Sequence, residues 1–463
     1  MNLLQNISPI DGRYKKYTEI LVPFFSEAAG MKYKVLMECE YLIALSETDG
    51  VKAPKLNEAK KTAIRKIYEN FSEADARLIS DFELRGKGKI KATNHDFKAM
   101  EYFIKEKLAK NGLDSLAEWV HFGLTSEDAS NIAYGLMVSE SLRGAIIPAL
   151  EKIVSQIKSL IRAGINAPML ARTHGQPASP TTFGKEFKIF SARIDRIIKK
   201  LKSHSIQAKL NGATGNYNAL VAAFPKVNWI KFSENFIRQI NKQRKTRLEI
   251  NLFTTQIESH DSLAELFNML RRANTVLIGL DQDLWRYVSD GWLAQKPVAG
   301  EVGSSTMPHK INPWFLENSE GNLGMADAML EFFSRKLPIS RLQRDLSDST
   351  VLRNIGTAFG HCLVGYGYLG LQLERLTINR EKALADLKSH PEVIAEAIQT
   401  ILRREGAVMP YEQLKNLTRG RRLEIEDFHK FIDGLKISQE VKKELKKIRP
   451  ENYIGLAAKL AGL

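Results

Sequence analysis

Residues 183–201 of the chain read FGKEFKIFSARIDRIIKKL. Apolar side chains recur in this stretch at alternating steps of four and three residues, at Phe183, Phe187, Phe190, Ile194, Ile197 and Leu201. A helix with about 3.6 residues per turn gathers such positions on one face, and a seam sustained over several heptads is typical of long helices packed side by side at shallow angles. The stretch therefore predicts a long amphipathic helix within a bundle.

The same spacing recurs in two later stretches. One seam comprises Leu266, Leu270, Ala273, Leu277, Leu280, Leu284 and Tyr287, and the other comprises Leu352, Ile355, Phe359, Cys362, Tyr366, Leu369, Leu373 and Leu376. Short alternating runs bounded by hairpin turns, which would indicate strands, are scarce. We therefore predict an all-α fold with a central long-helix bundle. Because such helices commonly pack against other chains, we also expect a homo-oligomer.

The helical pattern changes in character twice along the 463 residues. Residues 1–115 contain shorter helical pieces separated by polar turns, residues 116–370 carry the long helices, and residues 371–463 return to shorter, more charged pieces. A chain of this length is compatible with roughly three domains. We therefore predict an N-terminal helical domain, a central bundle domain and a C-terminal helical domain over these three ranges.

The composition is that of a folded globular protein, with 44% hydrophobic and 26% charged residues. Only two cysteines occur, Cys39 and Cys362, which argues against a disulfide scaffold or a cysteine-rich metal site and fits a reducing compartment. The N-terminal residues lack a basic segment followed by an apolar run, and no apolar stretch is long enough to cross a bilayer. These features predict a cytoplasmic protein without a signal peptide.

The chain carries a formal net charge of +15. A basic surplus can attract nucleic acid, anionic membranes or anionic small molecules. Here the basic residues are scattered, and the local concentrations at 419–422 and 442–449 contain no aromatic residue that could stack on a base. Solvated helix faces therefore account for most of the surplus, with attraction of anionic substrates as a secondary benefit. A nucleic-acid-binding helical protein remains the alternative, and it predicts tight, salt-sensitive binding.

Residues 303–313, GSSTMPHKINP, place two hydroxyls, a lysine and an asparagine beside a glycine and two prolines. Asn312-Pro313 predicts a helix start, with asparagine at the N-cap and proline at the first helical position. The preceding residues would then form a loop that leads into a helix N-terminus, where backbone N–H groups favour anions. A capped helix after a polar linker is the structural alternative.

Two short motifs indicate further helix starts. Thr93 is followed three residues later by Asp96, the spacing of a capping box, although nothing in such a cap requires the imidazole of His95. Thr125 and Ser126 place hydroxyls at a second cap, with acids in the first turn after them. Hydroxyls and free N–H groups at a helix N-terminus also suit a substrate carboxylate. Each motif therefore has a structural and a ligand-binding interpretation.

A turn between two predicted helices, Arg172–Pro177, contains His174 between a hydroxyl and an amide. Most histidines in turns are surface residues, but this connection is short and unusually dense in polar groups. Histidine is also the side chain best suited to deliver a proton near neutral pH.

Arg344 precedes a helical stretch in which Ser349 and Arg353 lie four residues apart and would share a face. Two guanidinium groups and a hydroxyl that converge in this way suit a phosphate, although an ordinary salt-bridged surface would give the same pattern. The glycine-rich stretch 211–216 matches neither a Walker loop nor a dinucleotide fingerprint, and we interpret it as a tight turn near the site. No motif for a metal site occurs, so neither a metal nor a cofactor is predicted.

These motifs together resemble the fumarase/aspartase superfamily of lyases. Its signature, Gly-Ser-Ser-x-Met-Pro-x-Lys-x-Asn, is matched at every fixed position by residues 303–312. His309 in the signature and the Thr-His-Gly-Gln of residues 173–176 resemble the adenylosuccinate lyase family in particular. The matches extend from Arg13 to Arg353, with small departures such as Ser259 in place of an expected proline.

The resemblance implies a three-domain fold completed by tetramerisation and a β-elimination that releases fumarate. The expected substrates are adenylosuccinate, which gives AMP, and the succinyl-carboxamide imidazole ribotide of purine nucleotide biosynthesis (SAICAR), which gives AICAR. By resemblance Ser304 is the general base, His174 the general acid, and Glu317 the carboxylate that orients His174. Lys310 and Asn312 would hold the succinyl carboxylates and stabilise charge as it develops, which makes Lys310 a catalytic residue by resemblance. Taken without the resemblance, Glu317 would simply complement the dipole of its helix.

The resemblance also implies a set of substrate-binding residues that separate motifs contribute to a homotetramer with shared active sites. These residues are Arg13, Tyr14, Asn94, His95, Asp96, Thr125, Ser126, Gln256, Asn312, Arg344, Ser349 and Arg353. The alternative within enzymes is another lyase of the superfamily, such as argininosuccinate lyase or fumarase. Those enzymes would not need the phosphate group formed by Arg344, Ser349 and Arg353.

Overall fold

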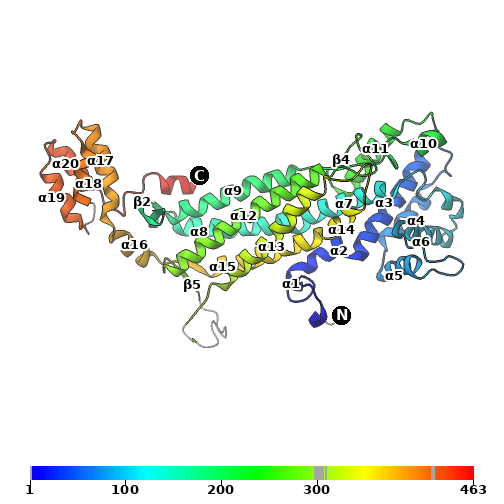
Figure 1. Cartoon of the computed structure of the whole chain (residues 1–463), viewed down its shortest axis with the longest axis horizontal. Coiled ribbons are helices and arrows are strands. Elements are labelled where there is room, and N and C mark those ends of the chain that lie inside the picture. Colours follow the sequence, from blue (N-terminus) through cyan, green and yellow to red (C-terminus); the bar gives the residue numbers. More distant parts are fainter. Residues whose placement is uncertain (1–2, 297–306, 308–309, 419–422) are drawn as a thin grey trace. The chain divides into compact units, whose positions relative to one another are not determined.

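The computed structural model describes residues 3–296, 307, 310–418 and 423–463. Most of these residues are helical, and the strands form three two-stranded sheets (Figure 1). The predicted all-α class is therefore confirmed. Across the same residues, no helix is both long enough and apolar enough to span a membrane.

The chain forms two compact units. Unit 1 comprises Met1–Ala149, Ile197–Thr275 and Asn322–Val364, and unit 2 comprises Leu150–Arg196, Val276–Gly321 and Gly365–Leu463. The boundaries between the units cut across the long helices. Division into three domains at 115 and 370 therefore stays a prediction.

Unit 1 contains the shorter helices of the N-terminal half together with segments of the long ones. Its complete α-helices are α1 (Lys15–Thr18), α2 (Val22–Phe25), α3 (Glu27–Glu47), α4 (Glu58–Glu69), α5 (Glu73–Leu84), α6 (Asp96–Lys110), α7 (Ser126–Ser141), α10 (Asn218–Ala223), α11 (Trp229–Arg244) and α14 (Ser347–Leu352). The 3₁₀ turns of this unit are Leu3–Gln5, Glu19–Leu21 and Asp114–Trp119, and Leu142–Ile146 is a π-helical segment. The strands β3 (Ile206–Ala208) and β4 (Leu248–Ile250) pair in parallel.

Unit 2 contains most of α8 (Ile147–Gly164) and the shorter helices of the C-terminal part. These are α16 (Arg380–Lys388), the 3₁₀ turn Pro391–Ile394, α17 (Ala395–Arg404), α18 (Pro410–Thr418), α19 (Ile425–Asp433), α20 (Gln439–Lys446) and α21 (Ala457–Gly462). The strands β1 (Pro168–Thr173) and β2 (Gln176–Thr182) form an antiparallel hairpin, and β5 (Leu293–Gln295) pairs with β6 (Leu376–Ile378).

Besides α8, four long helices have segments in both units: α9 (Phe183–Ser203), α12 (Asp261–Ser289), α13 (Trp314–Lys336) and α15 (Ile355–Arg375). The three predicted seams are buried, apart from the half-buried Tyr287. In unit 1, Asn274 of α12 donates a hydrogen bond to Asp327 of α13 (2.9 Å) and contacts the Cys362 sulfur of α15 (3.4 Å). The heptad pattern therefore predicted α9, α12 and α15 and the faces that they bury, although the third seam begins in α14 at Leu352 and ends in β6 at Leu376.

Close approach between α8 and α9 depends on two glycines in unit 2. A Cβ atom added at Gly184 would lie 2.7 Å from the Ile165 Cα, and one added at Gly164 would lie 2.7 Å from the Phe183 Cβ. Real Cβ atoms do not come this near, so glycine lets the two backbones pack at the end of the β1–β2 connection.

The connection between α8 and α9 differs from the sequence prediction. Instead of a simple turn between helices, the chain forms the β1–β2 hairpin, with His174 and Gly175 as its two-residue turn. Both residues have positive φ, +54° and +77° respectively, as tight hairpin turns of the primed types require. The usual signal for such a turn is Asn-Gly or Asp-Gly, and His-Gly is a weaker one, which is why the strands were missed.

Candidate active-site residues

The start of α7 lies as predicted. Thr125 occupies the N-cap position, and its N–H donates a hydrogen bond to Asp128 Oδ2 (2.9 Å). Ser126 is the first helical residue, and Glu127 and Asp128 follow as acids in the first turn. Thr125 and Asp128 thus form a capping box at the start of α7.

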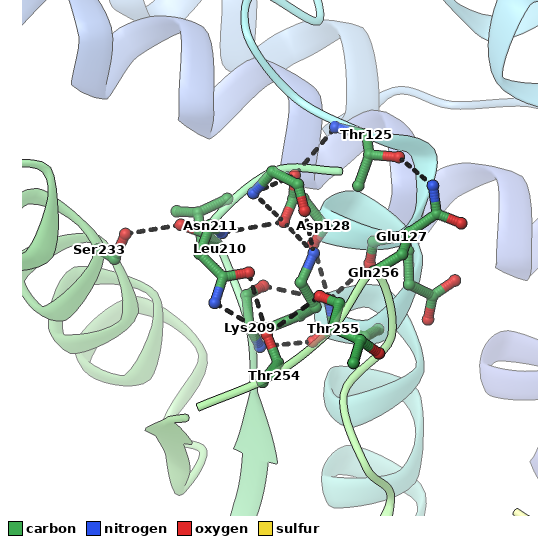
Figure 2. Close-up of polar contacts among 12 residues, drawn as sticks. Thr125, Glu127, Asp128, Lys209, Leu210, Asn211, Ser233, Thr254, Thr255 and Gln256 are labelled. Atoms are coloured by element: carbon green, nitrogen blue, oxygen red, sulfur yellow. Dashed lines mark hydrogen bonds and ion pairs between the residues drawn. The ribbon is translucent and has the colours of Figure 1, made fainter. Parts of the chain in front are cut away.

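Asp128 is also the centre of a buried ion pair that the sequence interpretation missed (Figure 2). The Lys209 ammonium lies 2.7 Å from Asp128 Oδ1 and donates a second hydrogen bond to the Gly212 carbonyl (2.9 Å), and both charged side chains are fully buried. Asp128 accepts further hydrogen bonds from the N–H groups of Asn211 (3.0 Å) and Gly212 (3.2 Å). The pair thus joins α7 to the glycine-rich turn, and no local motif distinguishes Lys209 from an exposed lysine in the sequence.

The glycine-rich turn lies close to predicted site residues, as expected. Gly212 and Gly215 have positive φ, and a Cβ atom added at Gly215 would lie 2.2 Å from the Thr254 carbonyl oxygen. The Asn211 amide donates a hydrogen bond to the Thr254 hydroxyl (2.8 Å; Figure 2). The turn therefore supports the backbone that leads to Gln256.

Gln256 connects two other residues predicted to bind substrate. Its amide nitrogen donates a hydrogen bond to the Thr125 hydroxyl (3.3 Å), and its amide oxygen accepts one from Arg344 Nη1 (3.4 Å). The other terminal nitrogen of Arg344 lies 3.3 Å from Glu127 Oε2. Unit 1 thus brings together Thr125, Gln256 and Arg344 from three distant stretches of sequence.

A second group lies in a cavity of about 350 Å³ in unit 1, which Lys34, Asp96, Tyr134 and Arg353 help to line. Lys34 forms an ion pair with Asp96 (2.8 Å). Burial opposes ionisation of Asp96, but the charge and hydrogen bond of Lys34 outweigh it and lower its pKa. Glu27 and Glu83 line the same cavity, so it presents three carboxyl groups, of which Asp96 is paired with Lys34, beside Arg353.

His95 has a structural role that was not predicted. It is the N-cap of α6, and its Nδ1 accepts a hydrogen bond from the Lys98 N–H (3.4 Å). The predicted capping box between Thr93 and Asp96 is therefore wrong, because the N-cap lies two residues later, at His95. The Thr93 hydroxyl instead donates to the His95 carbonyl and accepts from the His95 N–H. His95 and Ser126 both line a shallow depression of about 730 Å³ that also contains Lys91 and Lys98.

The same depression contains His121, which was not predicted to matter. His121 Nδ1 lies 2.6 Å from Glu38 Oε1. Burial alone would lower the pKa of His121, but the hydrogen bond and the charge of Glu38 raise it above the usual value. The lysines and this histidine make the depression suited to an anionic group.

Four further predicted residues occupy exposed or half-buried positions in unit 1. Arg13 lies in the turn before α1, and Tyr14 is the N-cap residue of that helix. Asn94 is exposed, with a left-handed backbone (φ +47°) and a backbone hydrogen bond from its N–H to the Glu83 carbonyl (2.9 Å). Ser349 lies in α14, and its carbonyl accepts from the Arg353 N–H (3.3 Å) at the end of that helix.

Unit 2 contains the predicted general acid. His174 is exposed at the tip of the β1–β2 hairpin, beside Arg172, whose guanidinium donates to the Gly175 carbonyl (3.3 Å). Glu317 lies in the first turn of α13 and accepts a hydrogen bond from the Trp285 indole (3.1 Å). Within the described part of a single chain, no hydrogen bond or ion pair joins His174 to Glu317.

The signature motif is only partly described. Ser304 and His309 lie outside the described residues, whereas Lys310 and Asn312 precede α13. The helix begins at Trp314, one residue later than predicted, so Pro313 occupies the cap position instead of the first helical one. Lys310 is exposed and Asn312 is half-buried. The predicted helix start after the signature is thus correct to within one residue.

Two family models match the chain. The one described as Lyase matches residues 12–327, and the one described as Adenylosuccinate lyase C-terminal matches residues 340–454.

Several proteins named adenylosuccinate lyase resemble the chain over nearly its whole length. The protein from Legionella pneumophila (strain Corby) is 45% identical over 462 residues, which cover 99% of this chain and 98% of that protein. The protein from Escherichia coli (strain K12) is 43% identical over 459 residues, with 99% and 98% covered. The protein from Dictyostelium discoideum is 46% identical over 467 residues, with 98% and 97% covered.

Two solved structures share the fold. The 3-carboxy-cis,cis-muconate lactonizing enzyme from Pseudomonas putida has a TM-score of 0.71 at 18% identity, with 97% of both chains covered. Fumarate lyase from Mesorhizobium sp. BNC1 has a TM-score of 0.72 at 17% identity, with 96% of both chains covered. At these identities the likeness concerns the fold alone, and it confirms the predicted fumarase/aspartase-like helical fold.

Proposed function

The chain belongs to the adenylosuccinate lyase family of carbon–nitrogen lyases, and we propose that it cleaves adenylosuccinate into AMP and fumarate with residues from both compact units. The main support for this substrate is that the chain resembles proteins named adenylosuccinate lyase over nearly its whole length. This resemblance includes the C-terminal family segment, residues 340–454, which contains the proposed phosphate-binding residues Arg344, Ser349 and Arg353.

The proposed reaction is a β-elimination. Ser304 removes a proton from the carbon beside a succinyl carboxylate, and the electron pair of that C–H bond forms the double bond of fumarate. The carbon–nitrogen bond breaks, its electrons pass to the nitrogen, and His174 delivers a proton there. A neutral serine is a weak base, so this role requires donors that stabilise its anion, and Lys310 in the same motif supplies a nearby positive charge.

His174 suits the role of acid because its position is fixed and its imidazole is accessible. Tight hairpin geometry holds its backbone, and the exposed ring can meet a substrate without rearrangement of the core. The proposed orienting carboxylate, Glu317, is bonded to Trp285 within its own chain. We therefore propose that the carboxylate that orients His174 comes from another subunit.

Lys310 and Asn312 are proposed to hold the succinyl carboxylates before the start of α13. This helix is 23 residues long, so its N-terminal N–H groups and dipole add to the attraction of the lysine. As negative charge develops on the substrate, a cation and oriented donors at this place would stabilise it.

The phosphate and the remainder of the nucleotide are proposed to contact unit 1. Arg344 offers a planar guanidinium beside Gln256 and the Thr125 hydroxyl, a combination that suits phosphate oxygens. The proposed set also contains Arg13, Tyr14, Asn94, His95, Asp96, Ser126, Ser349 and Arg353. SAICAR carries the same succinyl and phosphate groups, so we propose that the site also converts it to AICAR.

A homotetramer with shared sites is part of this proposal. The long helices expose large apolar side chains, including Ile189, Trp285, Met325 and Phe332. Such side chains on helices of a bundle fold are explained by packing against other chains. The two cysteines are both buried thiols, which supports a location in the reducing cytoplasm.

Substrate assays test the proposed function. The purified protein is expected to release fumarate from adenylosuccinate and from SAICAR, and not from argininosuccinate or malate. Turnover of argininosuccinate or malate without turnover of adenylosuccinate would assign the chain to another lyase of the superfamily. Filter binding of nucleic acid across salt concentrations is expected to show only weak retention, and tight binding without lyase activity would overturn the proposal.

A further inference from the structure

Three buried ionisable side chains of unit 1 gather beside Arg344 and have no assigned role in the reaction. They are Glu127 of α7, His260 immediately before α12, and Asp348 of α14, and each is at most 3% exposed. Each of them offers one nitrogen or oxygen atom that lies within 4.8 Å of the other two. We refer to Glu127, His260 and Asp348 as the buried cluster.

The cluster contains polar atoms without partners. Among the described residues, no hydrogen-bond partner exists for Glu127 Oε1, His260 Nε2 or Asp348 Oδ2, nor for Nε of the adjacent Arg344. A buried polar atom without a partner is costly, so several in one place need an explanation. Each of the three cluster atoms can accept a hydrogen bond, and two of them belong to carboxyl groups.

The charges of the cluster explain why these atoms lack partners. Two carboxylates in one buried space repel each other. Among the permanent cations that the structure describes, only Arg344 contacts the cluster directly, 3.3 Å from Glu127 Oε2. Lys209 also attracts Glu127, but it is paired with Asp128. A proton retained on a carboxyl group or on the imidazole would lower the net negative charge of the cluster by one and provide the missing donor between the cluster atoms.

We propose that Glu127, His260 and Asp348 share a proton and act as positioning residues for Arg344. The cluster would hold the guanidinium between Glu127 and Gln256, with its geometry fixed for an anionic phosphate of the substrate. This inference rests on the proposed function, because it assigns Arg344 to the substrate phosphate.

A metal ion is the competing explanation for three such side chains. Their spacing would allow it, but the guanidinium of Arg344 already occupies one side of Glu127 and repels a dication. The nearby Glu258 carboxylate is already engaged, because its Oε2 accepts a hydrogen bond from the His260 backbone N–H (2.7 Å). The arrangement therefore favours a proton, and metal content becomes an outcome of the test.

The cluster predicts a particular pH dependence. Burial raises the pKa of Glu127 to about 8, with Asp348 and Asp128 adding to the rise while Arg344 and Lys209 oppose it. Above that pH the cluster gains negative charge beside Arg344. The guanidinium is then more fully occupied by the carboxylate, so phosphate binding weakens and KM for adenylosuccinate rises.

The test compares kcat and KM of wild type, Glu127→Gln, Asp348→Asn and a matched control, Asp327→Asn, between about pH 6 and pH 9. Asp327 is a half-buried acid of the same unit that accepts a hydrogen bond from Asn274 and lies outside the cluster. Asp348→Asn removes a charge that helps to keep the proton on Glu127, so it is expected to raise KM near neutral pH by about tenfold to a hundredfold, with kcat within about threefold. Glu127→Gln mimics the protonated carboxyl group and should keep KM near the wild-type value below about pH 8. In Glu127→Gln the rise of KM above about pH 8 should disappear, whereas Asp327→Asn should keep it.

A measurement on the wild type keeps the inference testable if the variants do not fold. The rise of KM above about pH 8 should occur with adenylosuccinate and be absent with the corresponding nucleoside, which lacks the phosphate. Equal pH dependence for both substrates would overturn the inference. So would unchanged KM in folded Asp348→Asn, a rise of KM above about pH 8 that persists in Glu127→Gln, or one divalent ion per chain whose removal by a chelator abolishes activity. Absence of any adenylosuccinate turnover would instead contradict the proposed function itself.

Discussion

His174 illustrates how a single residue connects backbone geometry to chemistry. A left-handed backbone at a two-residue hairpin turn is tolerated by few side chains, yet histidine occupies that position here. A strained backbone conformation costs free energy, and such conformations are concentrated at functional sites. Its ring is solvent-exposed, so the side chain contributes little to the packing of the fold.

Replacement of His174 by glutamine is therefore expected to lower kcat by about 10²–10⁴-fold, the usual contribution of a positioned acid, without loss of thermal stability. Ser304→Ala should have a similar effect on kcat. Steady-state assays together with thermal unfolding check both variants. Ser179→Ala, on the same hairpin but away from its tip, is the matched control and should keep normal turnover. A His174→Gln protein with kcat within tenfold of wild type would remove this residue from the mechanism.

His121 predicts a dependence of stability on pH. Glu38 raises the pKa of His121 in the folded protein despite burial, so the folded state binds the proton more tightly than the unfolded state does. The resulting stabilisation is fully present below the unfolded value of about 6.5 and is lost as pH rises through the folded value. Thermal unfolding should show a larger deficit of His121→Gln relative to wild type at pH 6 than at pH 9. A deficit that does not change with pH would show that the ion pair contributes nothing.

At the scale of elements, the pair formed by Asp128 and Lys209 joins the start of α7 to β3 and the glycine-rich turn. Buried ion pairs of this kind add little net stability when intact, but the loss of one partner leaves a buried charge uncompensated. The pair therefore fixes where the Thr125 hydroxyl and the Gln256 segment meet.

Asp128→Asn is expected to destabilise the protein by about 3–5 kcal/mol, because the Lys209 ammonium is then buried without its counter-charge. Urea unfolding measures the loss. The double variant Asp128→Asn with Lys209→Met should recover a large part of it, since both charges are then absent. Equal stability of wild type and Asp128→Asn would mean that the lysine finds another partner.

Some of the helices and strands could be predicted from the sequence, and others could not. Heptad spacing predicts α9, α12 and α15 and the faces that they bury, because periodicity reflects packing within a helix and its neighbours. The β1–β2 hairpin escapes prediction because its turn uses His-Gly. The cap of α6 is misassigned because His95 replaces Thr93 at the N-cap.

The sequence did not predict which of the proposed site residues lie close together in space. Local motifs identify Thr125, Gln256 and Arg344, but their meeting in unit 1 depends on tertiary packing over more than two hundred residues. Lys209 and the buried cluster of Glu127, His260 and Asp348 carry no local motif that distinguishes them from exposed charges. Their burial is a property of the folded chain alone.

For the whole molecule, the proposed residues fall into two sets. Thr125, Gln256 and Arg344 belong to unit 1, whereas His174 and Lys310 belong to unit 2. The proposed homotetramer would combine these sets from different chains into each active site. Exposed apolar side chains on the long helices, such as Met325 and Phe332, are expected to become buried in that assembly.

Mixing two inactive variants tests this central proposal most directly. His174→Gln and Arg344→Gln are each expected to have little activity on adenylosuccinate. After the two proteins are dissociated together and reassembled at equal amounts, roughly a quarter of the sites should combine an intact His174 from one chain with an intact Arg344 from another, if chains mix at random in a symmetric tetramer. Fumarate release should then recover to about that fraction of wild type. Activity of the mixture that stays at the level of the separate variants, while mixed tetramers are demonstrably present, would contradict shared active sites.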